Sequence, residues 1–313
     1  MNRRNFLKGT SLAGLASIVG CKAAKAACAG GRCSCEINLC LQWNTIPVAD
    51  DFNAKLDYLE ANGYAAVEIP TGSKCEWVLQ KGEAFGKAMQ GRKLFCATAC
   101  GPSRFDYADP KKNDAEVAKF MPVLEILGGI KSVGLIICPA RKNPEVGLKE
   151  LREDFVTNTG KRLAEKAAKC GTSIVLEPLQ RKETPFLRQV SDAAKMAQEI
   201  GTGCTVLADF WHMTWEEAND RAAILSADSL LTHVHIASRR NRKIPGSDGT
   251  ADNYELGFRG LKEIGYTGAV SLEAGWVPKG VDSKGKSIFP DLAERHKILN
   301  KMCELLRRQW EEA

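Results

Sequence analysis

From residue 36 onward, short apolar runs rich in β-branched residues alternate with longer amphipathic stretches. The short runs have the length of buried strands, and the long stretches repeat apolar residues with the spacing of a helix face. The pattern predicts strands at Ile37–Leu41, Ala65–Ile69, Lys93–Ala97, Ser132–Ile137, Ser173–Leu176, Thr205–Ala208, Thr232–Ile236 and Ala269–Leu272. Helices are predicted between them, for example at Asp51–Asn62, Asn113–Leu127, Leu148–Lys169, Phe186–Ile200 and Trp215–Leu225, with a long final helix at Leu292–Arg308.

Eight strand–helix units in roughly 270 residues predict an α/β fold of the (β/α)8 TIM-barrel class. A doubly wound open sheet is the alternative, but that fold carries a glycine-rich phosphate turn after its first strand. Here the segment 43–47, WNTIP, occupies that place. Because no linker-like composition interrupts residues 36–313, this segment is predicted to be a single catalytic domain.

Residues 1–20 have the layout of an export signal. A basic start precedes a mildly apolar run, and the string R-R-x-F-L-K that begins at Arg3 resembles a twin-arginine signal. The segment 18–21, IVGC, resembles a lipobox, in which Cys21 is lipidated, while cleavage after Ala26 is the alternative. We therefore expect export by the twin-arginine route, a linker over residues 21–35, and a periplasmic protein whose only membrane contact is a lipid on Cys21.

Charge and cysteine content modify this picture only slightly. Three of the positive charges behind the net charge of +6 lie in the leader, so the remaining excess is too small to indicate a nucleic-acid partner. Among the 12 cysteines, four form the pattern C-x4-C-x-C-x4-C, which is not the usual spacing of a zinc site: Cys28, Cys33, Cys35 and Cys40. A disulfide in an oxidising compartment, or small apolar side chains in a linker and first strand, both fit this group.

Polar side chains stand at the ends of four successive predicted strands. Glu177 follows the fifth strand, Asp209 the sixth and Glu273 the eighth, while His235 lies near the end of the seventh. The carboxyl ends of barrel strands meet at one mouth, where active sites of this fold are found. Three carboxylates and one imidazole form a hard, oxygen-rich donor set that suits Mn²⁺, Mg²⁺ or Co²⁺.

Four strings around these residues carry a family resemblance: LEPLQRKET, ADFWHM, HVHIASRRNRKIPG and SLEAG. They resemble the xylose-isomerase-like TIM barrels of the sugar isomerase/epimerase superfamily, closest to its ketose 3-epimerase and hydroxypyruvate isomerase branches. The resemblance implies that Glu177, Asp209, His235 and Glu273 ligate one divalent cation, with Mn²⁺ preferred. It also implies that Glu177 and Glu273 exchange protons with the substrate.

The same resemblance implies substrate-binding roles for Glu183, His212 and Arg242. The basic loop before residues 244–246 is one residue longer than in the family pattern, so Arg240 is an alternative counterpart of Arg242. His233 shares a strand face with His235, which leaves a site role and a buried structural role open. The side chains of Trp43 and Trp211 fit either sugar stacking or core packing.

These residues predict a metal-dependent sugar isomerase or epimerase. A cation that chelates a carbonyl oxygen stabilises the enediolate formed when the adjacent proton leaves, and two carboxylates can remove and return that proton. The alternative is a lyase that eliminates from 3-keto-glycosides at the same metal site. Either reaction requires a small-molecule sugar or keto-sugar as substrate.

The long final helix is expected to pack on the outside of the barrel, where it can also contact a second subunit in a homo-oligomer.

Overall fold

The computed structural model describes residues 36–101, 105, 110–139 and 146–313 of the chain. Within these residues, eight parallel strands follow one another in sequence order and close into a barrel. This arrangement confirms the predicted TIM barrel and excludes the doubly wound open sheet. The strands are β1 (Leu39–Gln42), β2 (Ala66–Pro70), β3 (Phe95–Cys100), β4 (Gly134–Ile137), β5 (Ser173–Leu176), β6 (Cys204–Asp209), β7 (Leu231–Ile236) and β8 (Ala269–Leu272).

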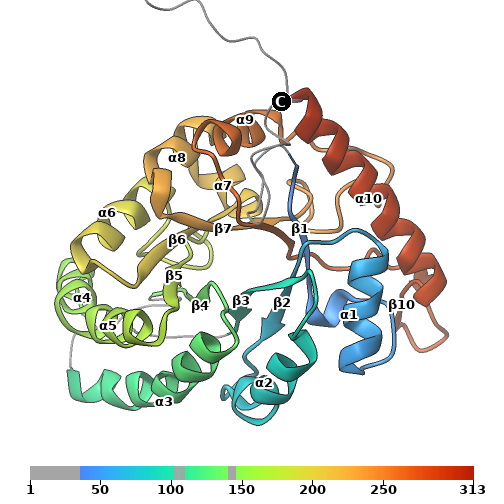
Figure 1. Ribbon diagram of the computed structural model, residues 1–313. Coiled ribbons are helices and arrows are strands. Elements are labelled where there is room, and N and C mark those ends of the chain that lie inside the picture. The colour runs from blue at the N-terminus through green and yellow to red at the C-terminus, as the bar shows by residue number, and fades with distance from the viewer. Residues whose placement is uncertain (1–35, 102–104, 106–109, 140–145) are drawn as a thin grey trace, which may run out of the picture.

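Helices surround the barrel on its outer side (Figure 1). Their apolar faces and the outward-facing strand residues form one large buried core. The helices are α1 (Phe52–Ala61), α2 (Glu76–Met89), α3 (Pro110–Gly129), α4 (Leu148–Asp154), α5 (Gly160–Cys170), α6 (Val190–Ile200), α7 (Phe210–Glu216), α8 (Asp220–Ala227), α9 (Glu255–Glu263) and α10 (Leu292–Glu312).

Two predicted helices have different limits in the structure. The helix expected at Phe186–Ile200 begins only at Val190, whose N–H donates to the carboxylate of Glu217, 2.8 Å away. The helix expected at Trp215–Leu225 is two helices, because the chain leaves α7 at Glu217 and restarts after Asn219, which caps α8. Both corrections place the segments after β5 and β6 in compact loops and turns at the barrel mouth.

The long stretch Leu148–Lys169 is helical as predicted, but a π-helical turn over Phe155–Thr159 separates α4 from α5. The final helix α10 extends beyond its predicted end to Glu312 and begins with a capping box between Asp291 and Glu294. A short hairpin that the sequence pattern did not predict, β9 (Gly280–Val281) with β10 (Ser287–Ile288), lies between β8 and α10.

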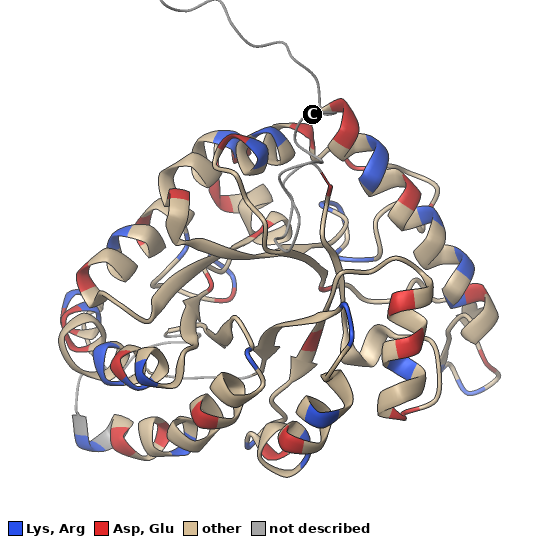
Figure 2. Ribbon diagram, viewed as in Figure 1, with Lys and Arg blue, Asp and Glu red and all other residues tan. Residues whose placement is uncertain are grey.

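Basic and acidic residues alternate along the outer helices, most visibly on α10 (Figure 2). Several pairs connect neighbouring helices, such as Arg152 with Glu199 at 2.7 Å and Arg221 with Glu263 at 2.6 Å. Exposed pairs of this kind each contribute little to stability, typically about 0–1 kcal/mol. None of the helices in the described part of the chain has the length and apolar character of a membrane span.

Strand register brings the candidate site residues to one level of the barrel. Asp209 on β6 is paired with His235 on β7, and His235 is paired with Ser271 on β8. The backbone N–H of Glu177 donates to Ile137 at the end of β4, and that of Glu273 donates to Ile236 at the end of β7. The four side chains therefore leave adjacent strands at the same mouth.

Candidate metal centre and active site

Four side chains from β5 to β8 meet at the carboxyl-terminal mouth of the barrel. One ligand atom each from Glu177, Asp209, His235 and Glu273 lies within 4.8 Å of all the others. His235 Nδ1 is 3.3 Å from Glu177 Oε1 and 3.3 Å from Glu273 Oε2. Glu177, Asp209 and His235 are almost fully buried, whereas the side chain of Glu273 is 22% exposed. The group is thus a deep cluster that opens on the side of Glu273.

Three atoms of this cluster are buried polar atoms without a hydrogen-bond partner among the described residues: Glu177 Oε1, Asp209 Oδ2 and His235 Nδ1. Buried polar atoms are nearly always satisfied, so unsatisfied ones require a specific explanation. All three lie on the ligand side of the cluster and are atoms that coordinate hard divalent cations. The residues therefore fit a divalent cation.

The other oxygens of the same carboxylates have partners that hold them in place. Asp209 Oδ1 accepts from the N–H of Trp211 at 2.7 Å and so caps α7. Glu177 Oε2 accepts from the thiol of Cys138 at 3.1 Å. Each of these two carboxylates is thus anchored through one oxygen and presents the other to the cluster.

The pKa values reflect mutual attraction within the cluster. Burial alone would raise the pKa of Glu273, but His235 and Arg242 outweigh it and lower this pKa to about 2. Burial raises the pKa of Asp209. Burial disfavours protonated His235, yet the carboxylates of Glu68 and Glu273 raise its pKa well above the usual value. A proton and a bound metal ion would therefore compete for the Nδ1 lone pair of His235.

Arg242 lies at the rim of the cluster. Its guanidinium donates to Glu273 Oε2 at 2.7 Å and to Glu183 Oε1 at 3.4 Å. The backbone of Arg242 has a φ of 55°, an uncommon conformation for a residue other than glycine that is concentrated at functional sites. The alternative, Arg240, instead donates to Asp248 and to the backbone of Thr250. The structure therefore brings Arg242 to the cluster and directs the side chain of Arg240 elsewhere.

His212 on α7 is buried, and its tautomer follows from one contact. Its Nδ1 accepts from the backbone N–H of Gln180 at 3.1 Å, so the ring proton resides on Nε2. That Nε2 atom lies 3.5 Å from Asp209 Oδ2 and has no hydrogen-bond partner among the described residues. His212 thus offers a proton donor to the mouth of the barrel.

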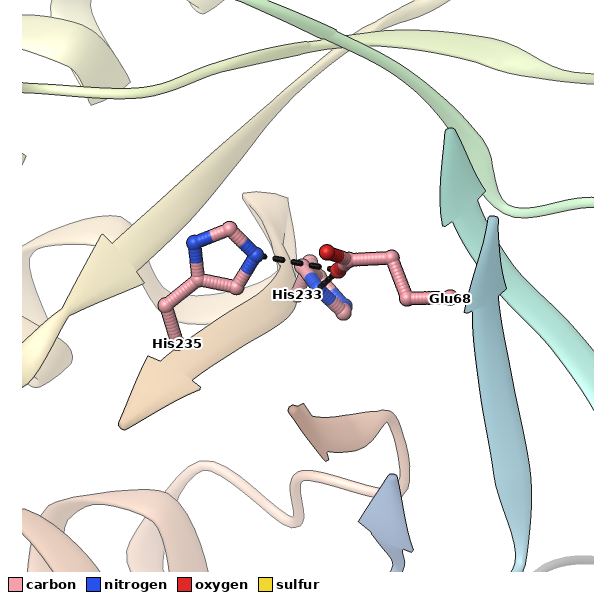
Figure 3. Close-up of side chains that lie close together, drawn as sticks. All are labelled: Glu68, His233 and His235. Atoms are coloured by element: carbon pink, nitrogen blue, oxygen red, sulfur yellow. Dashed lines mark hydrogen bonds and ion pairs between the residues drawn. The ribbon is translucent and has the colours of Figure 1, made fainter. Parts of the chain in front are cut away.

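The sequence interpretation missed Glu68 and left His233 undecided. Glu68 on β2 faces the barrel interior and meets the imidazoles of both His233 and His235 (Figure 3). The available signal was a single charged residue inside an otherwise apolar predicted strand, A-A-V-E-I. His233 is fully buried and turned toward Glu68, so it lies below the mouth rather than in the ligand set.

The two tryptophans differ in their surroundings. Trp43 is 2% exposed and packs edge-on against the rings of Phe52, Trp77 and Phe85, but it also lines the cavity beside Glu273. Trp211 packs edge-on against the exposed ring of Trp215. A cavity of about 180 Å³ lies beside Glu273, and its lining includes Asn44 and Cys100.

The leader and most of the proposed cysteine group lie outside the described residues, including Arg3, Cys21, Ala26, Cys28, Cys33 and Cys35. Cys40 on β1 is described and is a buried free thiol. Both interpretations of the group stay predictions, because its other three cysteines are not described.

Comparisons with known proteins agree with this architecture. A family model described as Xylose isomerase-like TIM barrel matches residues 56–308. The chain is 28% identical over 231 residues to 3-dehydro-D-guloside 4-epimerase of Escherichia coli (strain K12), a match that covers 70% of this chain and 85% of that protein. It is 31% identical over 171 residues to L-ribulose 3-epimerase of Methylomonas sp. (strain DH-1), which covers 54% of this chain and 58% of that protein.

Among solved structures, that of 3-keto-D-glucoside 4-epimerase from E. coli superposes with a TM-score of 0.69 at 24% identity. The superposition covers 85% of this chain and 99% of that chain. At this identity the likeness concerns the fold alone. By their names, these relatives are sugar epimerases that act on small-molecule substrates.

Proposed function

Because the chain belongs to the xylose isomerase-like TIM-barrel family, we propose that it is a divalent-metal-dependent sugar epimerase or isomerase. The proposed reaction removes a proton next to a carbonyl and proceeds through an enediolate. The proposed cofactor is one cation, with Mn²⁺ preferred over Mg²⁺ or Co²⁺. The observation that carries the proposal is the set of three buried, unsatisfied ligand atoms on Glu177, Asp209 and His235.

Glu177 and Glu273 are proposed to move the protons. They follow β5 and β8, so two strands lie between them, and an oxygen of each lies 3.3 Å from His235 Nδ1. Removal of a proton by one carboxylate and return by the other to the opposite face of the same carbon inverts that centre. Return to the neighbouring carbon would instead interconvert an aldose and a ketose.

The remaining roles follow from contacts at the mouth. A divalent cation, when bound, would stabilise negative charge on the substrate carbonyl oxygen as the neighbouring proton leaves. His212 offers its Nε2–H to a substrate oxygen, because its Nδ1 already accepts from Gln180. Arg242 and Glu183 are paired at the rim and are proposed to bind substrate hydroxyl groups as donor and acceptor.

A carbonyl-containing sugar is the proposed substrate class, as a free ketose or a 3-keto-glycoside. The names of the relatives support both types, and the cavity of about 180 Å³ beside Glu273 offers space for one end of such a molecule. The same site could also expel a leaving group from the carbon next to the enediolate. A lyase acting on 3-keto-glycosides is therefore the alternative that the experiment must separate.

Proton NMR in D₂O, with Mn²⁺-loaded protein removed before spectra are recorded, tests the function. Candidate ketoses and 3-keto-glycosides are incubated separately, with metal-free protein as the control. We expect deuterium at one carbon together with an inverted or isomerised product. Release of the aglycone without an inverted product would favour the lyase, whereas no exchange with any keto-sugar would contradict the proposed chemistry.

We also propose that the protein is exported by the twin-arginine route and anchored through Cys21. If so, Cys21→Ala should release the protein from the membrane fraction into the soluble periplasmic fraction. Fractionation followed by mass analysis of the mature N-terminus measures both properties. Unchanged membrane attachment, or a mature chain that begins after Ala26, would contradict the lipid anchor.

A further inference from the structure

A second cluster lies directly below the proposed metal centre, inside the barrel. Glu68 reaches from β2 toward the two histidines of β7 (Figure 3). Its Oε2 atom is 2.6 Å from His233 Nε2 and 2.9 Å from His235 Nε2. All three residues are at most 1% exposed. One carboxylate oxygen thus bridges two buried imidazoles.

Two further donors complete the surroundings of this carboxylate. The hydroxyl of Thr98 on β3 donates to Glu68 Oε2 at 2.9 Å, and the amide of Gln42 on β1 donates to Oε1 at 2.7 Å. Four donors from three other strands therefore surround Glu68, three of them directed at Oε2 and one at Oε1. A buried carboxylate is tolerated when it is satisfied in this way.

The short distances identify the cluster as hydrogen-bonded rather than metal-binding. Ligand atoms lie about 2.1 Å from a bound cation. When the angle between two of them at the cation is about 90° or more, the two ligand atoms are roughly 3 Å or more apart. The 2.6 Å and 2.9 Å separations at Glu68 are instead ordinary lengths for N–H donors to a carboxylate. Each histidine therefore carries a proton on Nε2 and donates it to Glu68.

We propose that Glu68 is a positioning residue for the metal ligand His235. Because Nε2–H of His235 donates to Glu68, the metal-accepting lone pair of the neutral ring is on Nδ1. That atom faces Glu177 and Glu273 and has no hydrogen-bond partner among the described residues. Glu68 thus selects the tautomer and holds the ring plane from the opposite side of the barrel.

His233 has a supporting part in this arrangement. Its Nε2–H approaches the same oxygen at 2.6 Å and, together with Thr98, fixes the direction of the Glu68 carboxylate. The ring of His233 also packs edge-on against that of His235, with centroids 5.0 Å apart. The inference rests on the proposed metal-dependent function, but it concerns how this chain prepares its ligand before any substrate binds.

The decisive variant is Glu68→Gln, which keeps the shape but places an amide NH₂ among N–H donors. Carboxylate partners of metal-ligating histidines typically contribute about 10- to 100-fold in metal affinity, and we expect a loss in that range for Mn²⁺. Ser271→Ala is the matched control, because Ser271 is fully buried and in register with His235, and its hydroxyl has no hydrogen-bond partner among the described residues. Its Mn²⁺ affinity is expected to equal that of the parent.

Isothermal titration of full-length, metal-free protein with Mn²⁺ gives affinity and stoichiometry without any substrate. Electron paramagnetic resonance of the bound Mn²⁺ gives a second readout, because a reoriented His235 changes the symmetry around the ion. The chain has 4 histidines, so selective ¹⁵N-histidine labelling of the Mg²⁺-loaded protein can resolve the tautomer of His235 directly. The parent should show Nε2–H, and Glu68→Gln should change this pattern.

Three outcomes separate this inference from the proposed function. If the parent does not bind Mn²⁺, the function fails and the inference fails with it. If the parent binds and Asp209→Asn weakens binding while Glu68→Gln does not, the function stands and the inference is overturned. A stoichiometry of two that falls to one in Glu68→Gln would also overturn it, because the cluster would itself be a metal site.

Glu68→Asp keeps the test decisive if Glu68→Gln does not fold. This variant retains the charge but withdraws the carboxylate by one methylene, so its bonds to the two imidazoles lengthen. We expect weaker Mn²⁺ binding than in Ser271→Ala at equal thermal stability. Equal affinities in these two variants would contradict the positioning role.

Discussion

Replacement of Asp209 by Asn separates metal binding from helix capping, because the two oxygens of Asp209 have different tasks. Oδ1 caps α7 by accepting from Trp211 at 2.7 Å, whereas Oδ2 is buried, unsatisfied and part of the ligand cluster. Asparagine keeps the first contact and replaces the second oxygen with an NH₂ group, which does not ligate a cation. The stability of the metal-free variant is measured alongside, because the new NH₂ group faces the N–H donors of His212 and Arg242, which lie 3.5 Å and 3.9 Å from Oδ2 in the parent.

The magnitude follows from binding linkage. At a free Mn²⁺ concentration of about 100 times Kd, a folded-state ligand stabilises by about 2.7 kcal/mol. For a domain of this size, that free energy corresponds to a rise in Tm of roughly 4–5 °C. We therefore expect the parent to show such a rise by differential scanning calorimetry and Asp209→Asn to show little or none at the same Mn²⁺ concentration.

The matched control is Asn219, the N-cap of α8, whose side chain accepts from Ala222 at 3.0 Å. Asn219→Ala should lower the metal-free stability by about 1 kcal/mol, the usual value for a lost cap, and retain the full Mn²⁺-dependent rise. If Asp209→Asn kept the parental rise, Asp209 would not be a ligand. If Asn219→Ala lost the rise, the difference would reflect general destabilisation, and the reasoning would be refuted.

Three further predictions concern the same mouth. Glu177→Gln and Glu273→Gln, each saturated with Mn²⁺, should lower kcat by about 10²–10⁴-fold, while one of the two variants still exchanges the substrate proton with D₂O. Parental rates in both variants would contradict the two-carboxylate mechanism. Arg242→Ala should raise KM by about 10- to 100-fold and leave Mn²⁺ affinity intact, whereas Arg240→Ala should change neither KM nor Mn²⁺ affinity. A raised KM in Arg240→Ala alone would make Arg240 the substrate-binding arginine. Glu68 and Glu273 raise the pKa of His235 against the effect of burial, so protons should compete with Mn²⁺ for this ring. Mn²⁺ affinity measured by titration calorimetry should therefore fall as the pH is lowered from about 8 to about 6. A constant affinity would contradict the competition between proton and metal.

Much of the fold could be predicted because a parallel barrel repeats one local signal. Each strand is a short apolar run and each helix an amphipathic one, and these patterns depend on neighbours within a few residues. The pattern did not predict that α6 begins at Val190 or that the helix after β6 is interrupted at Glu217, because both depend on contacts between loops. There, Glu217 at the end of α7 supplies an acceptor to the first N–H of α6, which no local pattern encodes.

The sequence by itself determined which four side chains meet at the mouth. Glu177, Asp209, His235 and Glu273 each stand at or near the end of an apolar run, and the ends of parallel strands share one edge of a barrel. Once the barrel was inferred, their convergence followed from topology alone.

Only the tertiary structure decided which groups surround and orient those side chains. Glu68 is 165 residues from His233 in sequence, yet the closed barrel turns both side chains into the same interior. The choice of Arg242 over Arg240 depends on a left-handed backbone in the loop after β7, and the tautomer of His212 depends on a backbone N–H in the loop after β5. Local patterns report which positions are buried, but hydrogen-bond partners depend on barrel closure and loop geometry, which bring together residues that are distant in the chain.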